Sequence, residues 1–181
     1  MRVITGKYKG RSLVAPKYDA RPTLDRMKET LFNIVNAKLD GACVLDLFAG
    51  SGQIAIECLS RGAVRAILCD NSREAVVAIK ANFEKIGATP ELMFCDFRDC
   101  LKRLPCQMDV VFVDPPYKAG FYNEVLQSID ELNVMNPNGW IVCEHASEDD
   151  LPDSIGKFTC FDRRKMGTVT FSFYKRSVLC E

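Results

Sequence analysis

The sequence lacks several features that mark whole classes of protein. No apolar run approaches the ~20 residues that cross a bilayer, and the first residues lack the apolar core and cleavage site of a signal peptide. The chain has one histidine, His145, and no C-x-x-C pair, so we expect a structural histidine and no metal site. Together these absences favour a cytoplasmic protein without a bound metal.

The cysteines also lack the pattern of a disulfide framework. There are nine of them, an odd number, and no regular spacing relates them. Five fall within or at the ends of apolar, strand-like segments, where a reduced thiol packs as a small hydrophobic group. These five are Cys43, Cys69, Cys95, Cys143 and Cys160.

The formal net charge is zero, but the charges are unevenly distributed along the chain. Residues 1–38 contain nine Lys or Arg and three Asp or Glu, and residues 157–176 contain six and one. Residues 39–156 contain nine basic and nineteen acidic side chains. Basic ends around an acidic centre fit a polyanionic partner, although charge alone is equally consistent with two solvated ends.

With 181 residues, the chain is long enough for one domain with a sizeable core. From residue 42 onward, apolar strand-like segments alternate with helix-like segments, which predicts an α/β fold with a doubly wound, mostly parallel sheet covered by helices. The last two strands flank a short basic turn at 162–167 and predict an antiparallel hairpin. We expect seven strands, at 43–47, 65–69, 91–95, 109–113, 140–143, 157–161 and 168–175, and helices at 53–61, 72–86, 99–104 and 121–132.

Residues 1–38 are expected to form an N-terminal extension to a main domain at residues 39–181. Two short β-type runs, 2–5 and 11–15, flank a glycine-bounded turn and predict a small hairpin with a basic tip. Apolar residues at helical spacing then predict a helix over 21–35. The basic residues of this part are candidate phosphate contacts, namely Lys7, Lys9, Arg11, Arg21 and Arg26, although Arg21, Arg26 and Lys28 are equally consistent with a solvated face.

Acidic residues recur where predicted strands end. Asp46 lies near the end of the first strand, and Asp70, Asp96 and Asp114 directly follow later ones. In a doubly wound sheet the carboxyl ends of the strands line the ligand crevice, so these four side chains should converge there.

The segment Asp46–Gly52 predicts a tight turn between the first strand and its helix. Its glycines allow a ligand to approach the backbone closely, and Asp70 lies at the spacing that suits ribose hydroxyls. Ala55 stands where the dinucleotide fingerprint has its third glycine, which disfavours a pyrophosphate and favours a nucleoside without phosphates. The alternative is an ordinary turn, with Asp70 or Asp96 acting only as a helix cap.

The segment Asp114-Pro115-Pro116-Tyr117 follows a strand that is predicted to be buried on both faces. The two prolines cannot continue the sheet and stiffen the chain, so they hold Tyr117 beside the carboxylate. A rigid acceptor next to an aromatic face suits a planar molecule that bears an amino group. The alternative is a Tyr117 side chain packed in the core.

These motifs resemble the class I S-adenosylmethionine-dependent methyltransferases that act on exocyclic amines. The N-terminal signature is narrower: Arg2-Val3-Ile4-Thr5-Gly6 with Gly10-Arg11, and Arg21-Pro22-Thr23 leading to Arg26-x-Lys28-Glu29-x-Leu31-Phe32-Asn33. It resembles the RsmD-like family, which methylates guanine N2 in 16S ribosomal RNA. The resemblance spans essentially the whole chain.

The resemblance implies a role for each matching residue. Asp114, Pro115, Pro116 and Tyr117 would be catalytic, and S-adenosylmethionine would bind Asp46, Phe48, Ala49, Gly50, Ser51, Gly52, Asp70, Asn71, Asp96 and Phe97. The five basic residues of the extension would bind 16S RNA or the assembled small subunit, and we expect a monomer. Two alternatives stay open: an adenine-N6 methyltransferase on DNA, and a non-catalytic RNA-binding factor on the same fold.

Overall fold

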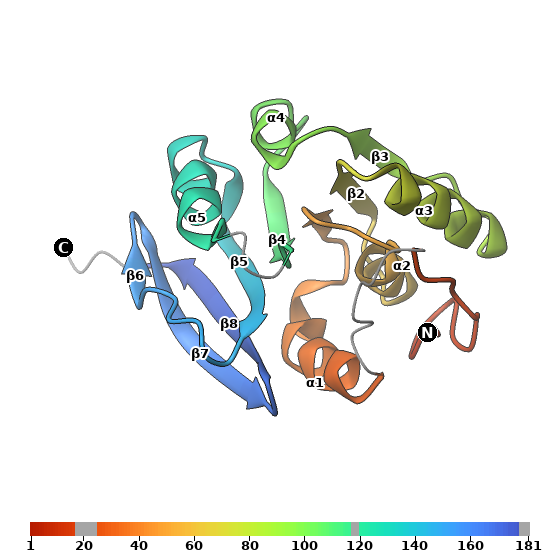
Figure 1. Ribbon diagram of the computed structural model, residues 1–181, viewed down its shortest axis with the longest axis horizontal. Helices are drawn as coiled ribbons and strands as arrows, with labels where there is room; N and C mark the ends of the chain where they lie inside the picture. The colour runs from red at the N-terminus through yellow and green to blue at the C-terminus, as the bar shows by residue number, and fades with distance from the viewer. Residues whose placement is uncertain (17–24, 117–119, 178–181) are drawn as a thin grey trace.

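The computed structural model describes residues 1–16, 25–116 and 120–177. Within this part, eight strands form one mixed sheet in the order β3-β2-β1-β4-β5-β8-β7-β6 (Figure 1). The strands are β1 (Cys43–Asp46), β2 (Arg65–Asp70), β3 (Glu91–Phe94), β4 (Met108–Val113), β5 (Met135–Ala146), β6 (Ser154–Ile155), β7 (Phe158–Met166) and β8 (Val169–Arg176).

The first five strands are parallel, and the last three are added antiparallel at one edge. The strand order reverses between β1 and β4, because the chain first builds outward through β2 and β3 and then returns to the other side of β1. A reversal of this kind opens a crevice at the carboxyl ends of the strands. The fold therefore places a ligand site next to the ends of β1 and β4.

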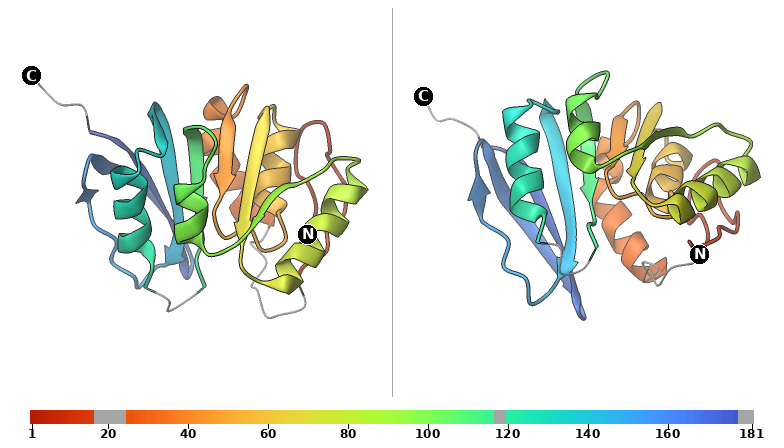
Figure 2. Two further views of the ribbon diagram at one scale, coloured as in Figure 1. Left: turned by 90° about the horizontal axis from the view of Figure 1, so that it is seen from above. Right: turned by 45° about the horizontal axis from the view of Figure 1, so that its top comes forward.

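Helices cover both faces of the sheet (Figure 2). They are α1 (Asp25–Val35), followed by a short 3-10 helix (Asn36–Lys38), α2 (Gln53–Ser60), α3 (Arg73–Lys85), α4 (Phe97–Lys102) and α5 (Tyr122–Glu131). Buried side chains of α1, α2 and α3 pack in one core cluster, and those of α4 and α5 pack in another. Both faces of the central strands are therefore buried.

The central strand β4 shows why the parallel strands are continuous apolar runs in the sequence. Val110 and Phe112 belong to the core on the α1–α3 side, whereas Val111 and Val113 belong to the core on the α4–α5 side. All four are at most 5% exposed, because successive side chains of a strand point to opposite faces and both faces are covered.

The mixed α/β fold with a C-terminal antiparallel hairpin is confirmed, but several details of the prediction were wrong. Strand β5 runs over Met135–Ala146, well beyond the predicted 140–143. The sheet has an eighth strand, β6, which is only two residues long. The basic segment 162–167 is mostly strand, because β7 continues to Met166 and pairs with β8 almost to the turn. The predicted N-terminal hairpin contains a single bridge, Arg2–Ser12, rather than two strands.

The N-terminal part packs into the same core as the rest of the chain. Val3 and Leu13, together with Leu31 and Phe32 of α1, are at most 7% exposed and belong to the core cluster that includes Val44 of β1. A division of the chain near residue 38 stays a prediction about domain organisation. Within the described residues, no helix is long and apolar enough to cross a membrane.

Candidate active site

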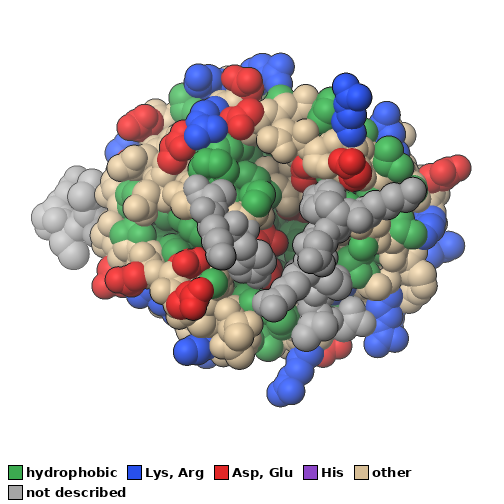
Figure 3. Space-filling view, in the orientation of Figure 1, with side chains coloured by type: hydrophobic (Ala, Val, Ile, Leu, Met, Phe, Trp, Pro, Cys, Tyr) green, Lys and Arg blue, Asp and Glu red, His purple; other side chains and the backbone are tan. Residues whose placement is uncertain are grey.

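A cavity of about 700 Å³ opens at the carboxyl ends of the parallel strands. This volume suits a ligand of nucleoside size or larger. Hydrophobic and acidic side chains surround the hollow on this face, and most Lys and Arg side chains lie toward its periphery (Figure 3). Six acidic residues belong to the lining: Asp46, Asp70, Asp96, Asp114 and Glu144, at or near the carboxyl ends of successive strands, and Glu74 in the first turn of α3.

Asp46 is the last residue of β1 and is 4% exposed. Its Oδ2 accepts a hydrogen bond from the backbone N–H of Ala55, in the first turn of α2, at 3.3 Å. The pKa of the Asp46 carboxyl is raised to about 7, chiefly by burial and also by the charges of Asp114 and Asp70, while the Ala55 hydrogen bond acts in the opposite direction. The environment of Asp46 in the cavity therefore disfavours the charged form of its carboxyl group.

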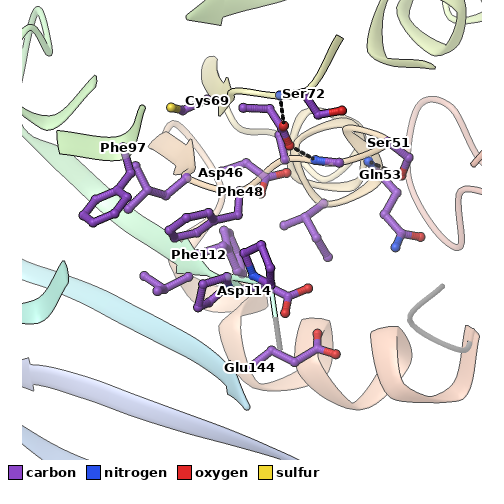
Figure 4. A pocket seen from close by; sticks show the side chains of 18 of the residues that line it. Asp46, Phe48, Ser51, Gln53, Cys69, Ser72, Phe97, Phe112, Asp114 and Glu144 are labelled. Atoms are coloured by element: carbon purple, nitrogen blue, oxygen red, sulfur yellow. Dashed lines mark hydrogen bonds between the residues drawn. The ribbon is translucent and has the colours of Figure 1, made fainter. Parts of the chain in front are cut away.

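Asp70, at the end of β2, is held by two backbone amides. Its Oδ2 accepts from Gly50 N and its Oδ1 accepts from Ser72 N, each at 2.8 Å (Figure 4). Ser72, not Asp70, caps α3, because the Ser72 hydroxyl accepts from Ala75 N. Each oxygen of Asp70 retains further lone-pair capacity, so the carboxylate is fixed in orientation and can still accept a ligand hydroxyl.

The turn after β1 contributes most of its predicted residues to the cavity wall. Phe48, Ala49, Gly50 and Ser51 all belong to the lining, as does Asn71 beyond β2.

Gly52 is the exception among the turn residues. It begins α2 with a φ of 73°, and a Cβ there would lie 3.0 Å from Leu68 and 3.3 Å from Ile79. The structure does not bring Gly52 into the cavity wall, because this glycine lies at the close contact of α2 with β2 and α3.

Asp96 and Phe97 form one edge of the cavity. Asp96 caps α4 by accepting from Arg98 N at 3.0 Å, so both the predicted role and its helix-cap alternative fit its position. The Phe97 ring is 3% exposed and lies between the rings of Phe48 and Phe121, with centroids 5.5 and 5.4 Å away. Helix α4 begins two residues earlier than predicted because of this cap.

Asp114, Pro115 and Pro116 follow β4 directly and line the cavity. The Asp114 side chain is exposed to the cavity, but surrounding protein removes much of its water. This desolvation, together with the charge of Glu144, raises the pKa of the Asp114 carboxyl well above its usual range. Tyr117 lies outside the described residues.

Glu144 is a cavity residue that the sequence prediction missed. Val113 of β4 pairs with Cys143 of β5, so Asp114 and Glu144 are the next residues along two neighbouring strands. Their carboxyl groups lie on the same side of the cavity (Figure 4). The signal was present, because Glu144 directly follows the predicted strand 140–143, the same placement as the other acids.

The N-terminal segment also contributes to the cavity, which no motif indicated. Met1, Ala15 and Pro16 line it together with Leu31 of α1. The Met1 sulfur accepts a hydrogen bond from Ser51 Oγ at 3.9 Å. The extension is therefore part of the site.

Two buried polar residues attach this segment to the sheet-covering helices. Glu57 of α2 is fully buried, and its carboxylate accepts from Ile4 N at 2.8 Å and Thr5 N at 3.1 Å. Asn82 of α3, also fully buried, donates to Val14 O at 2.9 Å and accepts from Val14 N at 2.8 Å. Since buried polar groups require partners, these contacts fix the path of the segment.

Lys28 does not lie on a solvated face, which corrects one interpretation of the N-terminal helix. It is fully buried, and its Nζ donates to Arg2 O at 2.7 Å. Lys28 belongs to the N-terminal signature that resembles the RsmD-like family, and its hydrogen bond joins α1 to the N-terminal segment.

The predicted RNA-binding residues Lys7, Lys9, Arg11 and Arg26 are exposed, and Arg21 lies outside the described residues. The C-terminal basic residues differ, because several have acidic partners nearby. Arg163 pairs with Asp153, Arg164 with Asp162 and Lys157 with Asp130. The exposed N-terminal residues are therefore the better candidates for contact with a polyanion.

Comparison with known proteins agrees with this geometry. The family described as "Conserved hypothetical protein 95" matches residues 1–175 of the chain. The chain belongs to this family. The resemblance to RsmD-like, class I methyltransferases is thereby confirmed.

Relatives of the family match nearly the full length of the chain. "Putative rRNA methyltransferase YlbH" from Bacillus subtilis (strain 168) is 35% identical over 97% of this chain and 99% of its own. "Ribosomal RNA small subunit methyltransferase D" from Escherichia coli (strain K12) is 31% identical over 97% of this chain and 90% of its own. The solved structure of "Putative methyltransferase yhhF from Escherichia coli" is 29% identical, covers 98% of both chains and has a TM-score of 0.85.

The cavity fits the methyl donor of this class, S-adenosylmethionine. Its described lining contains six carboxyl groups and no Lys or Arg, which favours a cationic ligand and opposes phosphates. By the resemblance, residues 46–52 would hold the methionine part, Asp70 the ribose, and Asp96 with Phe97 the adenine. When bound, S-adenosylmethionine supplies an electrophilic methyl group on a positively charged sulfur.

We predict that Asp46→Asn stabilises the fold at neutral and higher pH. The folded pKa of Asp46, about 7, lies above its ordinary value of 3.8, so the folded state keeps a proton that the unfolded chain has lost. Stability therefore falls as the pH rises from about 4 to about 7, by on the order of 4 kcal/mol. Asparagine does not titrate and avoids this loss.

Urea unfolding of both proteins between pH 4 and pH 8 measures this difference. The advantage of Asp46→Asn should grow through that range and then level off, and its affinity for S-adenosylmethionine should fall. Asp99→Asn, on the exposed side of α4, is the matched control. A constant difference across the range contradicts the prediction.

Proposed function

We propose that this protein transfers a methyl group from S-adenosylmethionine to the exocyclic N2 amine of a guanine in the 16S RNA of the small ribosomal subunit. One observation carries the proposal: Asp114-Pro115-Pro116 emerges from β4 into an acid-lined cavity at the point where the strand order reverses. Relatives of the same family that are named ribosomal RNA methyltransferases support RNA as the substrate class.

The residues after β4 explain how such an amine could react. An exocyclic amine is a poor nucleophile because its lone pair is delocalised into the ring. Hydrogen bonds from its two hydrogens to the Asp114 carboxylate and the Pro115 carbonyl would favour a pyramidal nitrogen with an available lone pair. The raised pKa of Asp114 also suits this carboxylate to take up the proton that the amine loses.

The positioning of the amine by this segment supplies much of the remaining rate enhancement. The two prolines restrict the backbone that carries Asp114, so the acceptor stays in one orientation. A fixed acceptor beside the cavity allows the amine to approach in line, and such alignment lowers the barrier substantially. Tyr117 would stack on the base, as the resemblance implies.

The experiment that tests this function compares substrates. The purified protein is incubated with labelled S-adenosylmethionine and 16S RNA, intact small subunits or duplex DNA, and the labelled nucleotide is then mapped. N2-methylguanine in 16S RNA is the expected product. Label in DNA adenine supports the DNA alternative, and failure to bind S-adenosylmethionine in calorimetry supports a non-catalytic RNA-binding factor.

We also propose that the protein acts in the cytoplasm as a monomer and without a metal. Within the described residues no group of three or more His, Cys, Asp or Glu side chains is placed to hold a metal ion. Activity that survives dialysis against a chelator, and a single 20.3 kDa species in sedimentation, are the expected results.

The basic turn of the N-terminal segment should contribute to RNA affinity. Replacing both Lys7 and Lys9 with alanine should weaken RNA binding and reduce the salt dependence of log K by about 1.5, because two phosphate contacts and their released counterions are lost. Binding is measured between 50 and 200 mM salt. Lys102→Ala with Arg103→Ala, at the end of α4 that points away from the cavity, removes the same charge; an equal change in slope for this control contradicts the prediction.

A further inference from the structure

Glu144 lies beside Asp114 at the end of the cavity where the amine would react. Val113 pairs with Cys143 in the parallel register of β4 and β5, so the two acidic residues follow this pair on adjacent strands. Adjacent strands lie about 4.8 Å apart. Both side chains line the cavity, and Glu144 is half-buried.

The backbone at Glu144 is firmly held. Glu144 pairs with Phe171 of β8 on the side opposite β4, and its carbonyl accepts a hydrogen bond from the Tyr122 hydroxyl of α5 at 2.7 Å. Pairing with β8, the adjacent Val113–Cys143 pair and a hydrogen bond from a helix leave little freedom for the backbone at this position. The two carboxyl groups therefore enter the same part of the cavity from adjacent strands (Figure 4).

The Watson–Crick edge of guanine matches such a pair. Guanine presents two neighbouring donors, the N1–H and the N2 amine, whereas adenine presents an N6 amine next to N1, which is an acceptor. Two carboxylates side by side can accept from both guanine donors. The same pair would repel the N1 lone pair of adenine, because neither carboxylate can donate when ionised.

We propose that Glu144 determines the base specificity of this enzyme by accepting the N1–H of the target guanine while Asp114 accepts from N2. The inference rests on the proposed function, since it requires a guanine amine at Asp114. The repulsion between the two acids supports it, because Glu144 helps to raise the pKa of Asp114 and a pair of donors would relieve that repulsion.

An analogue of guanine separates recognition of N1 from the reaction at N2. 2-Aminopurine retains the reactive amine but has an acceptor at N1. Two RNAs are prepared by ligation, with guanine or 2-aminopurine at the mapped target nucleotide, and methylated by the full-length protein. The wild type should prefer guanine strongly, because 2-aminopurine leaves the Glu144 carboxylate facing a lone pair.

Glu144→Gln should reduce this preference by roughly 10- to 100-fold, because the glutamine amide can donate to the N1 of 2-aminopurine. Glu144→Asp keeps an acceptor and should retain the preference at a lower rate. Glu148→Gln, an exposed glutamate shortly after β5, is the matched control and should leave the ratio unchanged. The ratio of rates reports recognition, because a general loss of structure lowers both rates alike.

The possible results separate the role of Glu144 from the proposed methyltransferase function. An unchanged ratio in Glu144→Gln, with guanine still methylated, overturns the role of Glu144 and leaves the proposed function intact. Loss of the preference in Glu144→Asp as well overturns the hydrogen-bond explanation. If the wild type methylates neither RNA, the proposed function itself fails.

Discussion

Replacing Asp114 with alanine or asparagine should lower the rate of methyl transfer by about 10²- to 10³-fold, the usual effect of removing one group that stabilises a transition state. The binding of S-adenosylmethionine should change little, because the Asp46, Asp70 and Asp96 carboxyl groups remain in the cavity. Asparagine retains an acceptor but cannot take up the proton of the amine. Its residual rate should therefore exceed that of alanine only slightly.

The pH profile tests the same assignment. The raised pKa of Asp114 means that the carboxylate is protonated at pH values where an ordinary aspartate is ionised. Only the ionised form can take up the proton of the amine, so kcat/KM should rise with pH through this raised pKa and fall below it. Asp114→Asn should abolish that limb of the profile.

Quenched single-turnover assays measure the rate of the chemical step, and calorimetry measures the affinity for S-adenosylmethionine. Together they separate chemistry from binding. Asp99→Asn, on the exposed side of α4, removes one carboxylate without touching the cavity and should behave as the wild type. Wild-type turnover in Asp114→Ala contradicts its role as the acceptor. A large loss of cofactor affinity in that variant would instead assign Asp114 to the donor side of the site.

Gly6→Ala should destabilise the fold by about 3 kcal/mol or more and also weaken S-adenosylmethionine binding. Gly6 has a φ of 86°, and a Cβ there would lie only 1.7 Å from the backbone oxygen of Ser60. That oxygen accepts from Lys7 N at 2.8 Å, so it cannot move away without loss of a hydrogen bond. The N-terminal segment must then leave α2, and Met1 leaves the cavity wall with it.

Gly10→Ala is the matched control, because Gly10 has a similar φ of 81° but no atom within 4 Å of the Cβ position. It carries the strain of a left-handed alanine alone, about 1 to 2 kcal/mol. For a chain of this size, Gly6→Ala should lower Tm by about 6 to 12 °C or more and Gly10→Ala by about 2 to 8 °C. Equal shifts would contradict the contact with Ser60 as the cause.

Local patterns were sufficient for most of the elements and for the acids at the strand ends. Apolar runs bounded by turns predict buried strands, and Asp46, Asp70, Asp96 and Asp114 follow from their positions relative to those runs. Glu144 was missed only because the expectation of an acidic residue after each strand was not extended to the fifth predicted strand, 140–143. The extent of β7 was misjudged because its exposed basic residues, Arg163 to Lys165, look like a turn until β8 lies beside them.

The contacts of the N-terminal segment could not be predicted in this way. Lys28 is equally consistent with a solvated face in the sequence, and no motif singles out Glu57, yet both are fully buried. Their partners are backbone groups more than 20 residues away in sequence, Arg2 O for Lys28 and Ile4 N for Glu57. No periodicity within a helix carries information about such partners.

The sequence by itself therefore determined the alternation of strands and helices, the turn after β1 and the rigid segment Asp114-Pro115-Pro116-Tyr117. Each of these features depends on residues that are close together in the chain. Only the tertiary structure decided that Glu144 lies beside Asp114 and that Met1 lines the cavity. These two placements depend on strand register and on the docking of distant segments, which are set by packing across the whole sheet.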